Sequence, residues 1–173
     1  KDLKPDRLDA AKRTGTRFIK ARPTDRIGLV VYEGEAFTAC PLTTDHDVLI
    51  GLLNESRSGL IDGGTAVGMG LATAVNRLRE SAAKSKVVIL LTDGVSNTGS
   101  VQPVDAAHIA EAMGIRVYTI GVGTKGKALS PVARYPNGKI QFDYVDVELD
   151  EATLREIASL TGGQYFRATD EQR

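Results

Sequence analysis

The sequence predicts an α/β protein with a doubly wound, mostly parallel sheet and one antiparallel edge strand. Strand and helix patterns alternate from Lys86 to the end of the chain, which is the order of repeated βα units with right-handed crossovers. The stretch "KVVILLTDG" (86–94) holds an unbroken apolar run, as expected where helices cover both faces of a sheet. Two earlier strand patterns, at 25–34 and 35–43, are separated only by a turn at Gly34, so these strands must be antiparallel.

The earlier part of the chain contains two helices around this hairpin. Apolar residues recur at helical spacing in "KPDRLDAAKRTGTRFIKARP" (4–23), and Pro23 ends the pattern. The stretch "DHDVLIGLLNES" (45–56) predicts a short helix with Asp45 near its start. A glycine-rich loop then leads into a helix within 58–81.

After the strand at 86–94 the predicted elements are a helix at 103–113, a strand at 115–123, a helix at 150–163 and a strand at 164–169. The intervening stretch is too long for an ordinary connection in a compact domain. Its Pro136-Asn137-Gly138 turn is flanked by Tyr135 on one side and by Ile140 and Phe142 on the other, which predicts a hairpin insertion around 125–147. We interpret this insertion as a surface elaboration, with partner binding as the alternative.

Composition favours a single domain over 1–173. The chain is 42% hydrophobic, enough for one core, and its 22 basic and 22 acidic residues argue against a nucleic-acid partner. Cys40 is the sole cysteine, which excludes an intrachain disulfide and a thiolate zinc cluster, and it is predicted to be a small buried hydrophobe. Without a long apolar run or a signal-peptide pattern at its start, the chain as given is expected to be soluble.

Two loops carry the candidate site. Thr65 lies in "DGGTAVG", where a helix begins, and Asp93 follows the apolar strand in "TDG". Loops at the carboxyl ends of the strands form the ligand crevice in open sheets of this type. Hydroxyl and carboxylate oxygens are hard ligands that suit magnesium, manganese or calcium. The neighbouring glycines, which let the backbone approach an ion closely, are Gly63, Gly64 and Gly94.

Each of these residues also has a simpler interpretation. Thr65 taken alone fits the N-cap of its helix, and Asp93 taken alone fits a turn former at the end of a strand. Phosphate binding by the glycine-rich loop is disfavoured, because neither GxxxxGK[ST] nor a GxGxxG after a strand occurs. The two histidines, His46 and His108, lack the partners of a catalytic pair and are predicted to be structural.

One further group of charged residues lies near the insertion. It is predicted to form a solvated face and a helix N-terminus rather than a metal site, and its members are Asp143, Asp146, Glu148, Asp150 and Glu151.

The sequence resembles the von Willebrand factor A domain family. The resemblance is carried by the successive stretches "DRIGLVVYEGEAFTACPLTTD", "GGTAVGMGLATAVNRL", "KVVILLTDGVSNTG" and "IRVYTIGVGT", and covers nearly the whole chain. "KPDRLDAAK" and "LTGGQYFRATD" are most similar to the bacterial aerotolerance-operon (Bat) membrane proteins. The resemblance implies a metal-ion-dependent adhesion site, or MIDAS, in which an acidic residue of a partner completes the shell of a divalent cation. Thr65 and Asp93 match its second and third loops.

The first loop of the family site, a DxSxS segment, is absent from this sequence, as is the central strand that precedes it in the family. Two side-chain oxygens leave most of a magnesium shell to water, so we expect the site in this chain to be incomplete and to hold an ion weakly. We also expect an upstream strand in the native protein. Its absence predicts a gap in the sheet with two exposed ladder edges, unless another strand substitutes for it.

The leading function hypothesis is a non-catalytic module that binds a partner protein's Asp or Glu through a divalent cation. The alternative is a metal-dependent α/β hydrolase or phosphoryl-transfer enzyme that uses Asp93, and a third is a purely structural assembly domain. The resemblance to the Bat proteins implies a longer protein of the bacterial inner membrane, with this domain in the periplasm. It also implies partners among the other membrane and ATPase components of an aerotolerance operon.

Overall fold

The computed structural model describes residues 7–56, 65–92, 99–122, 126–147 and 150–168. The helices are α1 (Arg7–Lys20), α2 (His46–Glu55), α3 (Val67–Arg79), α4 (Pro103–Ala112) and α5 (Glu151–Thr161). The strands are β1 (Ile27–Tyr32), β2 (Ala36–Thr43), β3 (Val87–Thr92), β4 (Arg116–Val122), β5 (Gly126–Arg134), β6 (Ile140–Val147) and β7 (Tyr165–Ala168). Each helix and strand predicted from the sequence is therefore found.

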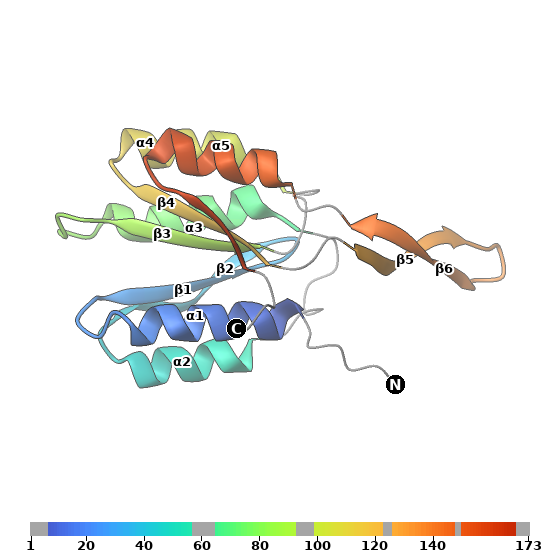
Figure 1. Ribbon diagram of the computed structural model, residues 1–173, viewed down its shortest axis with the longest axis horizontal. Helices are drawn as coiled ribbons and strands as arrows, with labels where there is room; N and C mark the ends of the chain where they lie inside the picture. Colours follow the sequence, from blue (N-terminus) through green and yellow to red (C-terminus); the bar gives the residue numbers. More distant parts are fainter. Residues whose placement is uncertain (1–6, 57–64, 93–98, 123–125, 148–149, 169–173) are drawn as a thin grey trace.

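The strands form the predicted mixture of parallel and antiparallel pairs. Strands β3, β4 and β7 are parallel, in the order β3-β4-β7, and β1 and β2 form an antiparallel hairpin. Strands β5 and β6 form a separate antiparallel pair. Helices α3, α4 and α5 lie on one side of the sheet, and α1 and α2 lie on the other (Figure 1). The fold class predicted from the sequence is confirmed.

The predicted gap in the sheet lies between β1 and β3. Among the described strands no ladder joins β1 to β3, and the sheet is divided into a β1-β2 part and a β3-β4-β7 part. A side chain connects the two parts, because the Tyr32 hydroxyl donates a hydrogen bond of 2.9 Å to the Leu91 carbonyl oxygen. Helix α3 contacts β1, β2 and β3 and so covers both sides of the gap.

Two hydrophobic clusters correspond to the two parts of the sheet. The larger cluster lies between α3, α4, α5 and the parallel strands, and its largest fully buried side chains are Leu71, Ile115, Val117 and Ile157. The smaller cluster has three buried members, Ile19, Cys40 and Leu49, which join α1, β2 and α2. The prediction that Cys40 is a buried apolar residue is confirmed.

Helix caps account for part of the acidic sequence near the insertion. Asp150 is the N-cap of α5, where its carboxylate accepts hydrogen bonds from the Thr153 backbone N–H (3.2 Å) and the Thr153 hydroxyl (2.7 Å). Glu151, in the first turn, pairs with Arg167 of β7 at 3.1 Å. The helix N-terminus predicted for these two residues is confirmed. Glu148 lies outside the described residues.

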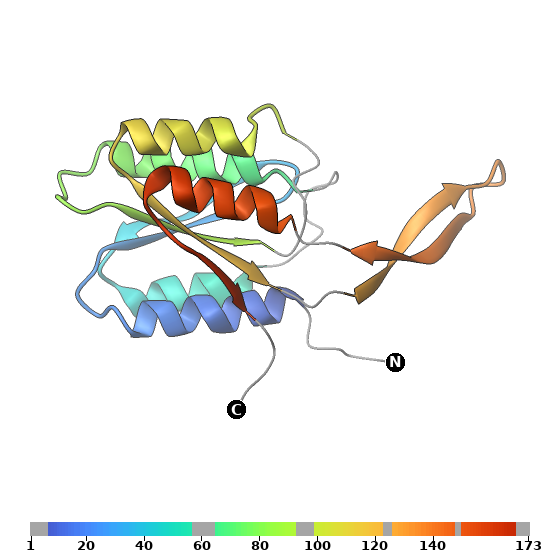
Figure 2. The same cartoon turned by 45° about the horizontal axis from the view of Figure 1, so that its top comes forward.

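Strands β5 and β6 form a hairpin that projects from one edge of the body, and we call it the arm (126–147) (Figures 1 and 2). Both views show it extending away from the helices and the remaining strands. Its turn contains Gly138, whose φ of 81° lies in the left-handed region that glycine adopts without strain.

Candidate cation-binding edge

The C-terminal ends of β1, β3 and β4 lie at the same edge of the molecule, and the arm projects from it (Figure 2). Helix α3 begins at this edge as well, and we call the group formed by these strand ends and the α3 start the cation edge. The α3 start is tied to the end of β1, because the Ala66 backbone N–H donates a 2.6 Å hydrogen bond to the Glu33 carbonyl. The hydrogen bond from Tyr32 to Leu91 ties the end of β1 to the end of β3.

Two glycines of α3 permit this close assembly. A Cβ atom on Gly70 would lie 2.5 Å from Cδ1 of Tyr32, so the tyrosine ring packs directly on the helix backbone. A Cβ atom on Gly68 would lie 2.0 Å from the Val101 carbonyl oxygen, which places α3 against the segment that leads into α4. The two glycines in "VGMGL" therefore allow α3 to pack closely against its neighbours, and this packing fixes the position of the helix.

Thr65 lies at the cation edge, two residues before the first residue of α3. The N-cap of α3 is Ala66, which has no side-chain capping hydrogen bond. The alternative interpretation of Thr65 as an N-cap residue is therefore wrong. Its position, with partial exposure at the edge, remains compatible with a cation ligand.

Asp93, the second predicted ligand, lies outside the described residues, as do Gly63, Gly64 and Gly94. Strand β3 ends at Thr92, which is buried at the cation edge, and Asp93 is the next residue in the chain. The described residues contain no group of three or more His, Cys, Asp and Glu side chains that could hold a metal ion. The two predicted ligands, a threonine hydroxyl and an aspartate carboxylate, are hard oxygen donors.

A surface hollow lies beside the α3 start. It is lined by the turn between β1 and β2, by the first helical turn of α3 and by the segment before α4, through Gly34, Glu35, Ala36, Met69, Gly99 and Ser100. The Ser100 hydroxyl donates a 3.3 Å hydrogen bond to the Met69 sulfur. Glu35 and Met69 thus line a hollow next to the segment that carries Thr65.

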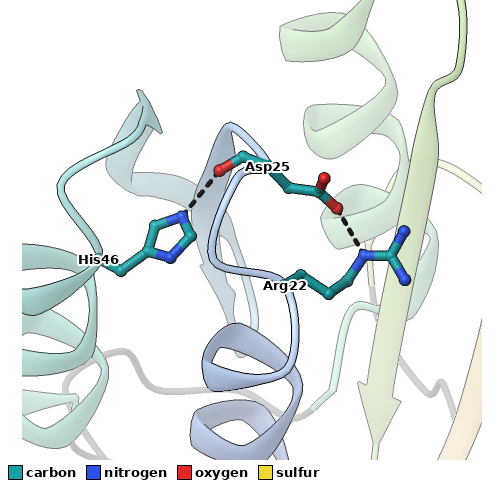
Figure 3. A network of polar contacts seen from close by, with 3 residues as sticks. All are labelled: Arg22, Asp25 and His46. Atoms are coloured by element: carbon teal, nitrogen blue, oxygen red, sulfur yellow. Dashed lines mark hydrogen bonds and ion pairs between the residues drawn. The ribbon is translucent and has the colours of Figure 1, made fainter.

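The two histidines have structural contacts away from the cation edge. Nε2 of His46, at the start of α2, lies 2.7 Å from the Asp25 backbone carbonyl oxygen, and Asp25 also pairs with Arg22 (Figure 3). These contacts fasten α2 to the turn between α1 and β1. His108 lies on the exposed side of α4, with Nδ1 3.5 Å from a carboxylate oxygen of Glu111.

Residues that sequence reasoning missed are those that assemble the edge. Tyr32 reads as one more apolar residue of a strand, and its bond across the gap depends on the position of β3, which no local pattern reveals. Glu33 contributes through its backbone carbonyl, which carries no sequence signal. The glycine spacing at 68 and 70 was the one available signal of close packing.

Comparison with known proteins identifies the family. Residues 5–173 match the von Willebrand factor type A domain. The chain belongs to this family. A structure of BatB from Bacteroides thetaiotaomicron has a TM-score of 0.80 and 30% identity, covering 98% of this chain and 83% of that chain. An aerotolerance-related membrane protein from Bacteroides fragilis has a TM-score of 0.80 and 29% identity, covering 97% and 84%.

More distant matches place the domain in longer proteins. An uncharacterized protein of Borreliella burgdorferi is 28% identical over 166 residues, which are 96% of this chain and 48% of the relative. The chain thus spans about half the length of the curated relatives that it matches. Proximal thread matrix protein 1 of the mussel byssus, with a zinc-occupied MIDAS motif, shares the fold at 19% identity and a TM-score of 0.69, covering 95% of this chain and 39% of that chain.

The von Willebrand factor A domain predicted from the sequence is confirmed, as is its likeness to the Bat-type proteins. Within the described residues, no helix combines the length and the apolar character required to cross a membrane.

Proposed function

We propose that this von Willebrand factor A domain is a non-catalytic module that binds an acidic residue of a partner protein through a divalent cation at the cation edge. Thr65 and Asp93 serve as ligands, together with hydroxyl and carboxylate residues that precede this sequence in the intact protein. The observation that carries the proposal is the assembly of the α3 start, the β1 end and the β3 end at one edge. That assembly supports a shared site for residues from separate loops.

The chain's own residues have defined tasks under this proposal. The cation, magnesium, manganese or calcium, supplies an open coordination position that attracts a carboxylate. The Thr65 hydroxyl offers a neutral oxygen ligand and Asp93 offers a charged one. The N-terminus of α3, which carries a partial positive charge, favours the approach of the partner's carboxylate. The hollow beside Met69 and Ser100 then accommodates groups that flank this carboxylate.

We further propose that a strand fills the gap between β1 and β3 in the intact protein and brings the remaining cation ligands to the edge. The support is that, among the described strands, no ladder joins β1 to β3, whose facing edges a strand between them would pair. Without that strand the domain retains few side-chain ligands, so the affinity of the present sequence for a cation is weak.

The proposal extends to the cellular setting. We propose that the domain belongs to a longer protein of the bacterial inner membrane, that it lies in the periplasm, and that it acts in a complex of aerotolerance proteins. The membrane description of the relative from Bacteroides fragilis and the half-length coverage of the curated relatives support this setting. The partner is then a protein with an exposed Asp or Glu. Other membrane components of the same operon are candidates for this partner.

Co-purification of the full-length protein from detergent-solubilised membranes tests the proposal. Partner proteins should be retained in magnesium, released by a chelator, and absent from the Asp93→Ala variant in either condition. Retention that is indifferent to both the chelator and Asp93→Ala would refute a cation-bridged contact and favour a purely structural domain. Loss of a hydrolytic or phosphoryl-transfer activity in Asp93→Ala, with partner retention intact, would instead identify an enzyme.

A further inference from the structure

The arm is the part of the structure with the least support from the remaining fold. Strands β5 and β6 contact each other extensively, and both views show them standing clear of the body (Figures 1 and 2). An isolated two-stranded hairpin in water is marginally stable at best. The arm is therefore a poor structural element on its own, and its exposed surface is available to another molecule.

The tip of the arm, residues 133–141, has a defined turn. The Tyr135 backbone N–H donates to the Lys139 carbonyl at 2.8 Å, and the Gly138 N–H donates to the Tyr135 carbonyl at 2.9 Å. The Asn137 side-chain oxygen accepts from the Lys139 N–H at 3.1 Å. The Tyr135 hydroxyl donates to Oε1 of Gln141 at 2.9 Å. These bonds define the backbone of the turn and position the Tyr135 side chain, which lowers the entropy that this side chain loses when a partner binds.

The chemistry of the tip is basic and apolar. All residues from 133 to 141 are exposed, and Tyr135 and Ile140 each expose 49% of their surface. Arg134 and Lys139 are the charged residues of this stretch, so it carries two positive charges in a chain whose formal net charge is +0. Exposed tyrosine and arginine side chains are the residue types that anchor protein interfaces. Arg134 is paired with Ile140 and Tyr135 lies opposite Lys139, so each face of the tip carries one cation beside one apolar side chain, a combination that is complementary to an acidic surface.

The arm joins the body at the cation edge, and this position indicates which partner surface the arm can contact. Strand β4 ends at Val122 and β5 begins at Gly126, so the arm arises from the same edge as the α3 start. Under the proposed function, a partner whose carboxylate reaches the cation edge lies beside the base of the arm and presents at least one acidic side chain there.

We propose that the arm tip is a second contact for the acidic protein that docks at the cation edge, with Arg134 and Lys139 binding its carboxylates and with Tyr135 and Ile140 packing beside them. This inference rests on the proposed function. The cations of the tip also steer the partner toward the edge, because complementary charge accelerates association at low ionic strength.

Fluorescence of a Tyr135→Trp variant tests the tip directly, since the chain has no other tryptophan. The probe is an oligo-glutamate peptide, titrated into the protein in the presence of a chelator. We expect saturable binding that weakens as salt is added, because exposed charge contacts are screened. Adding Arg134→Glu and Lys139→Glu should weaken binding about tenfold, since both contacts become repulsive.

The matched control adds Arg79→Glu and Lys84→Glu to the same tryptophan variant. These two exposed cations lie at the end of α3 and before β3, on the opposite edge of the body, and their reversal changes the net charge equally. The control should bind the peptide within about twofold of the parent, because only long-range charge is altered.

Three results would overturn the inference: no binding of the peptide, equal weakening in the control, or preferential binding to vesicles of phosphatidylglycerol and phosphatidylcholine through the same two cations. The last result would assign the tip to a lipid surface. Because the titration contains a chelator, it is independent of the cation. Failure at the tip with cation-dependent partner binding intact would refute the arm alone.

Discussion

The two parts of the sheet differ in how they are held together. The β3-β4-β7 part packs against α3, α4 and α5 around a cluster with many fully buried side chains. The β1-β2 part packs against α1 and α2 around three buried residues, and most of the other apolar side chains in its cluster are partly exposed. The β3-β4-β7 part has a large core of its own. The β1-β2 part has a small core and depends on its contacts with α3 and on the bond from Tyr32, at the end of β1, to β3.

The candidate site lies at the junction between the well-packed part and the weakly packed part of the sheet. Tyr32 belongs to β1 but packs against the larger cluster, so one strand contributes to both parts. The cation edge is at this junction, with the α3 start tied to β1 and β1 tied to β3. A strand or an ion bound at the junction would link the two parts and stabilise the weaker one.

Substitution in the larger cluster should have the largest effect. Leu71→Ala should lower the free energy of unfolding by about 2–5 kcal/mol. Leu71 is fully buried, and its closely packed neighbours cannot fill the cavity that the smaller side chain leaves. Leu49→Ala, at an equally buried site of the smaller cluster, should cost less because partly exposed neighbours such as Leu52 and Leu53 can relax into the space. Urea denaturation followed by circular dichroism measures both, and equal losses would contradict the comparison.

Crowding at the junction should have the second-largest effect on stability. Gly70→Ala should destabilise the protein by about 1–3 kcal/mol, because the added methyl group meets the Tyr32 ring and must displace it. Gly51→Ala in α2 has open space around it and should instead stabilise the protein by up to about 1 kcal/mol through helix propensity. Thermal unfolding of the two variants checks the pair, and a neutral Gly70→Ala would mean that Tyr32 does not fix α3.

Removing the bond across the gap should have a smaller effect. Tyr32→Phe leaves the Leu91 carbonyl without this donor and should cost about 0.5–1.5 kcal/mol. Amide hydrogen exchange should speed up mainly in β1 and β2, since the weaker part loses its tie to β3. Tyr135→Phe, which removes an exposed hydrogen bond of the arm, is the control and should leave exchange in the body unchanged. Uniform acceleration across both parts would show that they unfold as one unit.

The smallest effect concerns alkaline pH. Burial, followed by the hydrogen bond to Glu151 and its negative charge, raises the pKa of Tyr165 above its usual value. The neutral phenol is thus favoured in the folded protein, and its contribution is complete below the unfolded-state pKa of about 10 and is lost as pH rises through the folded-state pKa. Stability measured by urea denaturation should fall less steeply above about pH 10 in Tyr165→Phe than in the parent protein. Parallel slopes would contradict this account.

Local patterns in the sequence determined most of the fold. Helical spacing, the apolar run at 87–91 and the turn at Gly34 each act over a few residues, so every element could be predicted from them. The gap in the sheet could also be predicted, because the family resemblance implies a strand between β1 and β3 that this sequence lacks. The bond from Tyr32 to Leu91 could not be predicted, since its partners are far apart in the sequence and meet only after both parts of the sheet have formed.

Of the two predicted site residues, the structure describes Thr65 and leaves Asp93 outside the described residues. Thr65 stands at the predicted edge, and the structure excludes its simpler role as an N-cap. Its role as a ligand and that of Asp93 remain predictions, because ligand geometry depends on the precise approach of separate loops. Sequence patterns report which side chains can bind an ion, whereas tertiary contacts decide whether they meet.

The most direct test is the binding of manganese, followed by electron paramagnetic resonance, to protein that includes the residues preceding Lys1. The account predicts saturable binding that Thr65→Val weakens by about tenfold or more, because a metal ligand is lost. Thr73→Val, the same chemical change within α3, should leave it unchanged. Equal manganese affinity in the parent protein, Thr65→Val and Asp93→Ala would contradict the claim that these residues share a cation.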